Sequence, residues 1–113
     1  MSTESAAAKV IRAINSAIPD IPVFNGVYTG DLLRYAVFTE TIPRAYFADD
    51  KAEEVVVSVR VHFFTDIHEN TTQLKRAVRK ALENEGFNYP TQEDASDEDT
   101  QHIVWDTEIS MGA

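Results

Sequence analysis

The side chains that most often carry out chemistry in proteins are scarce or scattered in this chain. It contains no cysteine, which excludes thiolate catalysis and disulfide pairing. No Gly-x-Ser-x-Gly motif marks a nucleophile elbow, and the four glycines are too scattered to form a phosphate-binding loop. The sequence therefore predicts a protein that is not an enzyme.

The three histidines are the remaining candidates for catalysis or metal binding. His62 and His102 both fall on the more polar side of an alternating segment, so two strands of a sheet can bring their rings together. Metal sites usually add closely spaced ligands and supporting carboxylates, and the sequence offers no such partners for this pair. We therefore expect solvated or hydrogen-bonded histidines, with no metal and no cofactor.

Acidic residues gather at two places, and each raises the question of a cation site. Asp49 and Asp50 fall in an expected hairpin tip, where nothing predicts the burial that shifts a carboxyl pKa. The acidic run over residues 93–99 lacks the Asp-x-Asp-x-Asp-Gly arrangement of a calcium loop. We interpret both segments as solvated.

Four of the ten basic residues lie close together in one predicted helix. A solvated helix face is the commoner explanation of such a set, and a binding surface is the rarer one. Because the acidic segments of the same chain offer the complementary charge, self-association through this set is a natural hypothesis. It predicts an assembly that weakens as salt is added. This basic set consists of Lys75, Arg76, Arg79 and Lys80.

Length and composition bound the class of protein. The 113 residues suffice for one domain with one core, and 43% hydrophobic and 26% charged residues are typical of a globular chain. The formal net charge of −9 repels polyanions, so specific nucleic-acid binding is not expected. No apolar run reaches the length of a membrane span and no secretory signal is visible, so the expected compartment is the cytoplasm.

The hydrophobic pattern predicts the elements that hold these residues. The central one is a strand over residues 54–65, in which five apolar residues alternate with a mixed face. At about 40 Å it is about twice the usual length, so it crosses the middle of a sheet or forms half of a long hairpin. A second strand over residues 34–42 is closed by Pro43. The alternating apolar residues are Val55, Val57, Val59, Val61 and Phe63.

Two amphipathic helices are predicted on either side of these strands. The first covers residues 4–17 with Ser2 or Thr3 as its N-cap, and it is followed by a segment with one short strand near residues 23–28. The second begins at an N-cap at Asn70 and ends at Gly86, which suits a left-handed C-cap. Residues 88–100 are polar and are predicted to form a loop, and residues 101–111 alternate as a last strand.

This order predicts an α+β fold with a mainly antiparallel sheet, a long hairpin and both helices on one face. The long strand and the last strand are separated by one helix, which allows a parallel pairing with a right-handed crossover. Tyr46 and Phe47 fall near the hairpin tip. Exposed aromatic residues there often mark an interface, and folding back onto the sheet is about as common an alternative.

The order of elements resembles the tail-terminator and tail-completion proteins of long-tailed, non-contractile bacteriophages. The similar parts are the alanine-rich first helix with Ile-Pro-Asp-Ile-Pro-Val-Phe at residues 18–24, and the strand over residues 55–65. They continue with the helix that ends in Gly86-Phe87, and with His-Ile-Val-Trp at residues 102–105 after the acidic run. The likeness is one of architecture, carries no diagnostic motif, and covers nearly the whole of residues 1–113.

The resemblance implies a structural virion protein without catalytic residues. Such proteins form a closed ring, commonly six-fold, in which one patch meets a different patch on the neighbour. The ring caps the tail tube and joins it to the head-completion proteins. The implied partners are other copies of the chain, a tail-tube protein and a head-completion protein, first in the host cytoplasm and then at the head–tail junction.

The second face of the long strand is too apolar for plain solvent surface, so we expect it to contact other subunits. A small ligand-binding or regulatory domain is the alternative, with a pocket near Arg60 and His62. An acidic DNA mimic is a third possibility that the basic set argues against. The predicted interface comprises the basic set together with Tyr46, Phe47, Asp49, Asp50, Val56, Arg60, His62 and Phe64.

Overall fold

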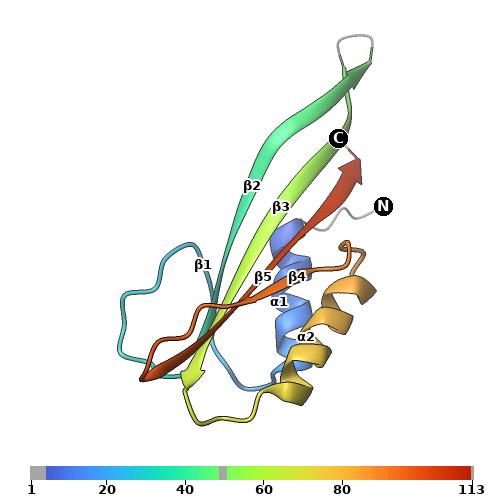
Figure 1. The fold of residues 1–113 in the computed structure, drawn as a ribbon. Helices are drawn as coiled ribbons and strands as arrows, with labels where there is room; N and C mark the ends of the chain where they lie inside the picture. Colours follow the sequence, from blue (N-terminus) through green and yellow to red (C-terminus); the bar gives the residue numbers. More distant parts are fainter. Residues whose placement is uncertain (1–4, 49–50, 113) are drawn as a thin grey trace.

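The computed structural model describes residues 5–48 and 51–112, and the side chains of residues 5–41 and 55–111. This part of the chain forms two helices and five strands, in an α-β-β-β-α-β-β order that confirms the α+β prediction (Figure 1). No helix in it is long and apolar enough to cross a membrane. The elements are α1 (Ala6–Ala17), β1 (Val23–Asn25), β2 (Tyr35–Ala48), β3 (Lys51–Asp66), α2 (Thr72–Asn84), β4 (Thr91–Asp94) and β5 (Thr100–Gly112).

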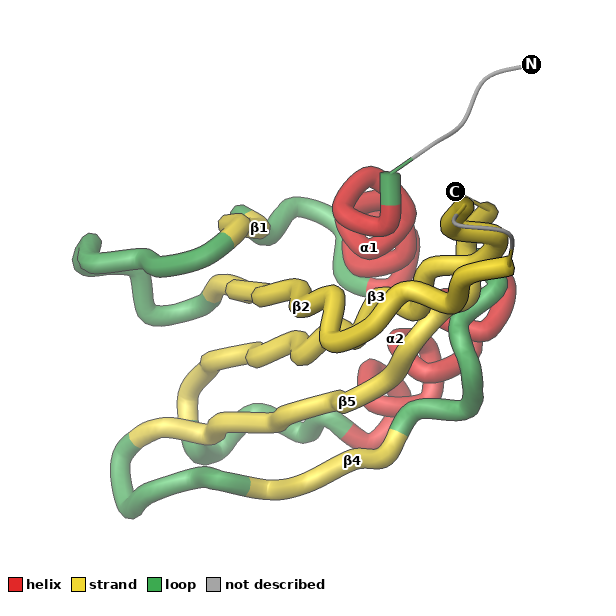
Figure 2. The backbone as a smooth tube through the Cα atoms, turned by 90° about the horizontal axis from the view of Figure 1, so that it is seen from above, coloured by secondary structure: helices red, strands yellow, loops and turns green. Residues whose placement is uncertain are grey.

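The five strands form one sheet in the order β1-β2-β3-β5-β4, with β3 at its centre. Only β1 and β2 pair in parallel, and the other pairs are antiparallel. Both helices lie on one face of the sheet, and β2 and β3 extend beyond them as a long hairpin (Figure 1 and Figure 2). The predicted central strand, hairpin and helix-covered face are therefore confirmed.

The antiparallel pairing of β5 with β3 corrects the parallel pairing that the sequence allowed. The cause is β4, in a segment that the sequence predicted to be a loop. β4 follows α2 as the crossover strand, and a short turn then returns the chain as β5 between β4 and β3. All four residues of β4 are exposed and polar, so the strand has no alternation of apolar and polar residues by which the sequence could predict it.

The core lies between the inner face of the sheet and the two helices. The odd-numbered residues of β3 from Val57 to Phe63 are buried there, as the alternation predicted. Trp105 of β5 is fully buried beside them, and its indole N–H donates to Gln92 Oε1 of β4 at 3.1 Å. Burying side chains of this size stabilises the fold by about 1.5–3 kcal/mol each.

The helices begin later than the sequence predicted. Ser5, instead of Ser2 or Thr3, caps α1, because its Oγ accepts a hydrogen bond from the Ala8 N–H at 3.1 Å. The N-cap of α2 is Thr71 instead of Asn70, whose side-chain oxygen accepts from the Thr72 N–H. The end of α2 is as predicted: Gly86 has a positive φ of 101°, which suits a residue without a side chain.

Strand β2 continues through Pro43 to Ala48, so the prediction that the proline closes the strand was wrong. The pairing of β2 with β3 shifts between Thr41 and Arg44, and this irregularity contains the proline. β1 pairs with β2 only at residues 36–38, so this part of β2 forms an edge of the sheet. Proline is tolerated at such an edge because no strand needs its missing N–H.

Candidate functional site

The face of the sheet opposite the helices carries a continuous row of rings, which we call the aromatic stripe. It crosses β1, the loop after it, β2, β3 and β5, and successive ring centroids lie 4.2–5.1 Å apart. Every ring in it is half-buried, which is unusual for a solvent-facing side of a sheet. In order, the stripe consists of Phe24, Tyr28, Tyr35, Phe64, His102 and His62.

Strand register places these rings beside one another. Tyr35 lies opposite Phe64, which in turn lies opposite His102, so one row spans three strands. In the next row His62 lies between Val37 and Val104. These two valines are only 8% and 4% exposed although they lie outside the main core cluster. The outer face therefore holds a small apolar layer of its own.

The two histidines of the stripe share a hydrogen bond, with His62 Nδ1 and His102 Nε2 2.8 Å apart. The prediction that two strands bring them together is confirmed. One nitrogen must donate and the other accept, so the bond exists only while at least one ring is neutral. Among the described residues, no group of three His, Asp or Glu side chains is placed to hold a metal ion.

Burial is the main cause that lowers the pKa of both rings below the ordinary histidine value. At His62 the positive charges of His102 and Arg60 lower the pKa further, while Asp106 opposes them. At His102 the nearby acidic residues of β4 and the turn after it, including Asp94, oppose the effect of burial. Both rings are therefore favoured in the neutral form.

Arg60 lies one row further along the outer face, opposite Asp106. The two side chains form a bidentate ion pair, with Nε–Oδ1 at 2.7 Å and Nη2–Oδ2 at 3.2 Å. This pair holds the pKa of the guanidinium above its usual value, the hydrogen bonds being the largest cause. Because Arg60 is already paired within the chain, it is a poorer candidate for binding an external anion.

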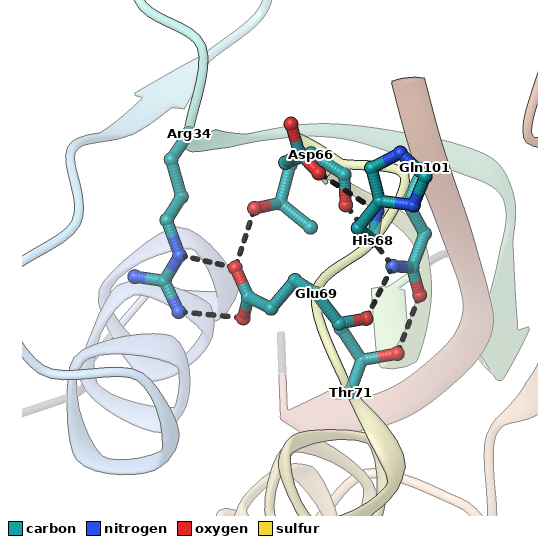
Figure 3. A network of polar contacts seen from close by, with 7 residues as sticks. Arg34, Asp66, His68, Glu69, Thr71 and Gln101 are labelled. Carbon is teal, nitrogen blue, oxygen red and sulfur yellow. Dashed lines mark hydrogen bonds and ion pairs between the residues drawn. The ribbon is translucent and has the colours of Figure 1, made fainter. Parts of the chain in front are cut away.

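A polar network around Glu69 (Figure 3) joins residues that neighbour Tyr35, Phe64 and His102 in the sequence. Three of its members are direct sequence neighbours of these rings, and Arg34 and Thr65 are the neighbours of the first two. Glu69 joins both: it accepts two hydrogen bonds from the Arg34 guanidinium at 3.0 Å, and one from the Thr65 hydroxyl at 2.6 Å.

The third of these sequence neighbours is Gln101, which precedes His102. Its side-chain amide donates to the Glu69 carbonyl at 3.0 Å and accepts from the Thr71 hydroxyl (Figure 3). Thr65, Thr71 and Gln101 are buried, and no buried side-chain polar atom in the described part of the chain lacks a partner. The network therefore holds three strands in register where the stripe crosses them.

An open groove of about 670 Å³ lies on the outer face beyond the stripe. Its walls include Thr39, Ser58, Arg60 and Tyr89, so hydroxyl and charged groups dominate it. His62 does not line it. The pocket expected near Arg60 and His62 thus includes the arginine but not the histidine, and it is not the apolar cavity typical of small-molecule sites.

The predicted interface residues divide into three groups. Val56, Arg60, His62 and Phe64 lie together on the outer face, and all of them except the exposed Arg60 are half-buried. The basic set lies on α2, on the opposite side of the sheet, so the structure does not bring it to the stripe. Asp49 and Asp50 lie outside the described residues, as do the side chains of Tyr46 and Phe47.

Two members of the basic set interact with other residues of the chain, Arg79 through a ring contact and Lys75 through its charge. The Arg79 guanidinium lies over the Tyr89 ring, 5.2 Å from its centroid. Hydrogen bonds from Ser96 are the main cause that lowers the pKa of Asp94, and the charge of Lys75 adds to them. The exposed members are Arg76 and Lys80.

Sequence reasoning did not place Phe24, Tyr28 and Tyr35 on this surface. It brought His102 close to His62 but left His102 out of the predicted interface. The available signal was the aromatic content of residues 24–35, followed by an alternating strand. That signal does not give register, and register decides which rings meet across a sheet.

No protein-family model matches this sequence, and no curated protein matches it. Solved structures do match. A chain from the "Virion of native gene transfer agent (GTA) particle" aligns with a TM-score of 0.63 at 13% identity, covering 96% of each chain. A second solved chain aligns with a TM-score of 0.53 at 10% identity, covering 96% of this chain and 99% of that chain. At these identities the comparisons show a shared fold over nearly the full length.

Proposed function

We propose that this protein is a non-enzymatic structural component of a phage-like virion particle. The observation that carries the proposal is the fold shared over 96% of both chains with a chain of a gene transfer agent virion. Within such a particle we assign it the role of a tail terminator, as the order of its elements suggests. Copies then form a closed ring that caps the tail tube at the head–tail junction, in contact with a tail-tube protein and a head-completion protein.

The outer face supports a role in assembly. It presents half-buried rings and two buried valines outside the main core, where a free-standing domain more often presents polar side chains. Val56, His62 and Phe64 of this face are candidates for subunit contact, and Arg60 with Asp106 forms a charged border. Apolar centres with charged rims are typical of protein interfaces.

Deletion of the gene from cells that produce phage-like particles tests this role. Without a cap that joins the tube to the head, we expect separate heads and tails in electron micrographs, and restoration of joined particles by the wild-type gene. The protein is also expected in purified joined particles, located at the junction by a labelled antibody. Normal joined particles from the deletion strain, free of the protein, would contradict the proposal.

A small ligand-binding domain is the second candidate, and only the groove beside Arg60 favours it. It predicts that a small molecule raises the midpoint of thermal unfolding in proportion to the logarithm of its concentration. The variant Ser58→Trp, which fills the groove from the outer face, then abolishes the shift. A structural subunit shows no such shift and retains its place in particles.

A further inference from the structure

Apart from Ile11 on α1, the large apolar side chains that remain exposed in the described part of the chain lie at two opposite edges of the sheet. One group lies in the loop between β1 and β2, where Val27 and Leu33 are 83% and 84% exposed. The other is Tyr89, 66% exposed, in the segment that leads into β4. Figure 1 and Figure 2 both place this loop and this segment on opposite sides of the molecule.

The contacts that hold the loop over residues 26–34 in shape leave the exposed apolar side chains of the loop free. The Tyr28 ring stacks on Phe24 with centroids 4.3 Å apart, and its hydroxyl accepts a hydrogen bond from the Leu32 N–H at 2.9 Å. Gly30 lies against the Tyr28 ring so closely that no side chain fits there. At the end of the loop, Arg34 is fixed by Glu69. Because the loop is already ordered, binding through it costs little conformational entropy.

The opposite edge offers a surface of complementary chemistry. Tyr89 presents an aromatic ring, and Arg79 places a guanidinium over that ring. The loop carries an exposed acidic residue, Asp31, between its apolar residues. An apolar contact of Leu33 with Tyr89 and an ion pair of Asp31 with Arg79 can therefore form together.

We propose that the loop over residues 26–34 of one copy docks on the Tyr89–Arg79 edge of the next copy. This inference rests on the proposed ring, because a closed heterologous ring needs two different patches on opposite sides of each subunit. It specifies which edges meet, which the proposed function leaves open. If the loop instead binds another protein, such as a tail-tube protein, the disulfide experiment will identify that partner.

Disulfide trapping tests the contact, since the chain has no cysteine of its own. The double variant Leu33→Cys/Tyr89→Cys is oxidised both in concentrated solution and in purified particles that contain it. We expect a ladder of covalent multimers, because each copy links to two neighbours. Each single variant yields dimers at most. Leu33→Cys/Thr72→Cys, with its second cysteine at an exposed position about two turns before Arg79 on α2, is the matched control and yields no ladder.

The outcomes separate this inference from the proposed function. If oligomers or particle-bound copies are present but no ladder forms, the edge-to-edge contact is wrong and the ring proposal stands. A link from residue 33 to a different virion protein likewise overturns the contact and assigns the loop to that partner. If the protein neither oligomerises nor enters particles, the ring and the contact both fail.

Charge exchange gives a second test that does not depend on disulfide geometry. Asp31→Arg is expected to weaken self-association about tenfold, the effect of a moderate interface residue. Arg79→Glu is expected to do the same, and the two changes together restore association because the pair is reversed. Thr29→Arg, at an exposed position of the same loop, is the control for added positive charge. If the double variant self-associates no more strongly than either single variant, the pairing of Asp31 with Arg79 is contradicted.

Discussion

At the scale of residues, the hydrogen bond between His62 and His102 is the most chemically sensitive contact on the outer face. Both rings are half-buried, and their shared bond needs one unprotonated ring nitrogen as the acceptor. The charged groups around them are Arg60 and Asp106 on one side and the acidic residues near Asp94 on the other. Protonation of both rings would therefore break the bond and place two cations in one half-buried row.

Acidification is expected to destabilise the fold through this pair. The pKa values of His62 and His102 lie below the ordinary value of 6.5 in the folded state, whereas the unfolded chain titrates near 6.5. Below that pH the unfolded state binds more protons, so the free energy of unfolding falls as pH decreases from about 6.5 through the folded-state pKa values. Urea unfolding between about pH 7.5 and about pH 5.5 measures this slope.

The double variant His62→Gln/His102→Gln is expected to reduce the dependence of the free energy of unfolding on pH in this interval. The variant His68→Gln, at an exposed histidine outside the stripe, is expected to retain that dependence. The pKa values of Glu69, Asp94 and Asp97 are also lowered, chiefly by hydrogen bonds. Their contribution is lost only at more acidic pH, below their ordinary values of 4.5 and 3.8, so the two effects are separable. An unchanged slope in the double variant would count against the pair as its cause.

Neighbouring residues of β3 are expected to respond very differently to truncation. Phe63 is buried between the sheet and the helices, so Phe63→Ala should lower the free energy of unfolding by about 3–5 kcal/mol. Phe64 is half-buried on the outer face, so Phe64→Ala should cost about 1–2 kcal/mol and impair assembly more than folding. Urea unfolding and particle incorporation measure the two effects. Equal losses of stability would contradict the assignment of faces.

At the scale of elements, the sequence predicted what depends on local periodicity. The alternation of β3 and β5, the stripes of both helices and the left-handed Gly86 were visible because each needs only neighbouring residues. The sequence did not predict β4, because its four residues are polar and exposed and only backbone pairing with β5 defines the strand. The aromatic stripe was only partly predicted, since Tyr35, Phe64 and His102 form one row through a strand register that no single segment encodes.

The network around Glu69 is predicted to hold three strands in register. Glu69→Ala removes the acceptor of the buried Thr65 hydroxyl and of the Arg34 guanidinium. An unsatisfied buried hydroxyl costs about 1–3 kcal/mol, and the partly exposed ion pair adds little. We therefore expect a loss of about 1–3 kcal/mol by urea unfolding.

Glu83→Ala is the control for this experiment, because Glu83 is an exposed residue of α2. The control is expected to change stability by less than about 0.5 kcal/mol. Faster amide exchange in β2 next to Tyr35 would show that Glu69→Ala loosens the strand end. A variant as stable as the wild type would mean that water replaces the carboxylate without cost.

At the scale of the whole molecule, basic and acidic residues lie in different regions, and the net charge is strongly negative. The formal net charge of −9 makes copies repel one another at long range. Arg76 and Lys80 form an exposed basic area on α2, whereas β4 and the turn after it are acidic. A ring that alternates these areas would offset part of the repulsion.

Salt dependence decides whether the basic set takes part in assembly. If Arg76 and Lys80 meet acidic residues of a neighbour, raising salt from about 0.05 M to about 0.5 M weakens self-association, because the Debye length falls well below the size of a subunit. Arg76→Glu/Lys80→Glu should then weaken association at low salt and remove the weakening by added salt, as measured by sedimentation equilibrium. Thr72→Glu/Gln73→Glu, at exposed uncharged positions of the same helix, controls for added negative charge. Association that strengthens with salt in the wild type would instead show that long-range repulsion dominates, leaving the apolar edges and the aromatic stripe to hold the assembly together.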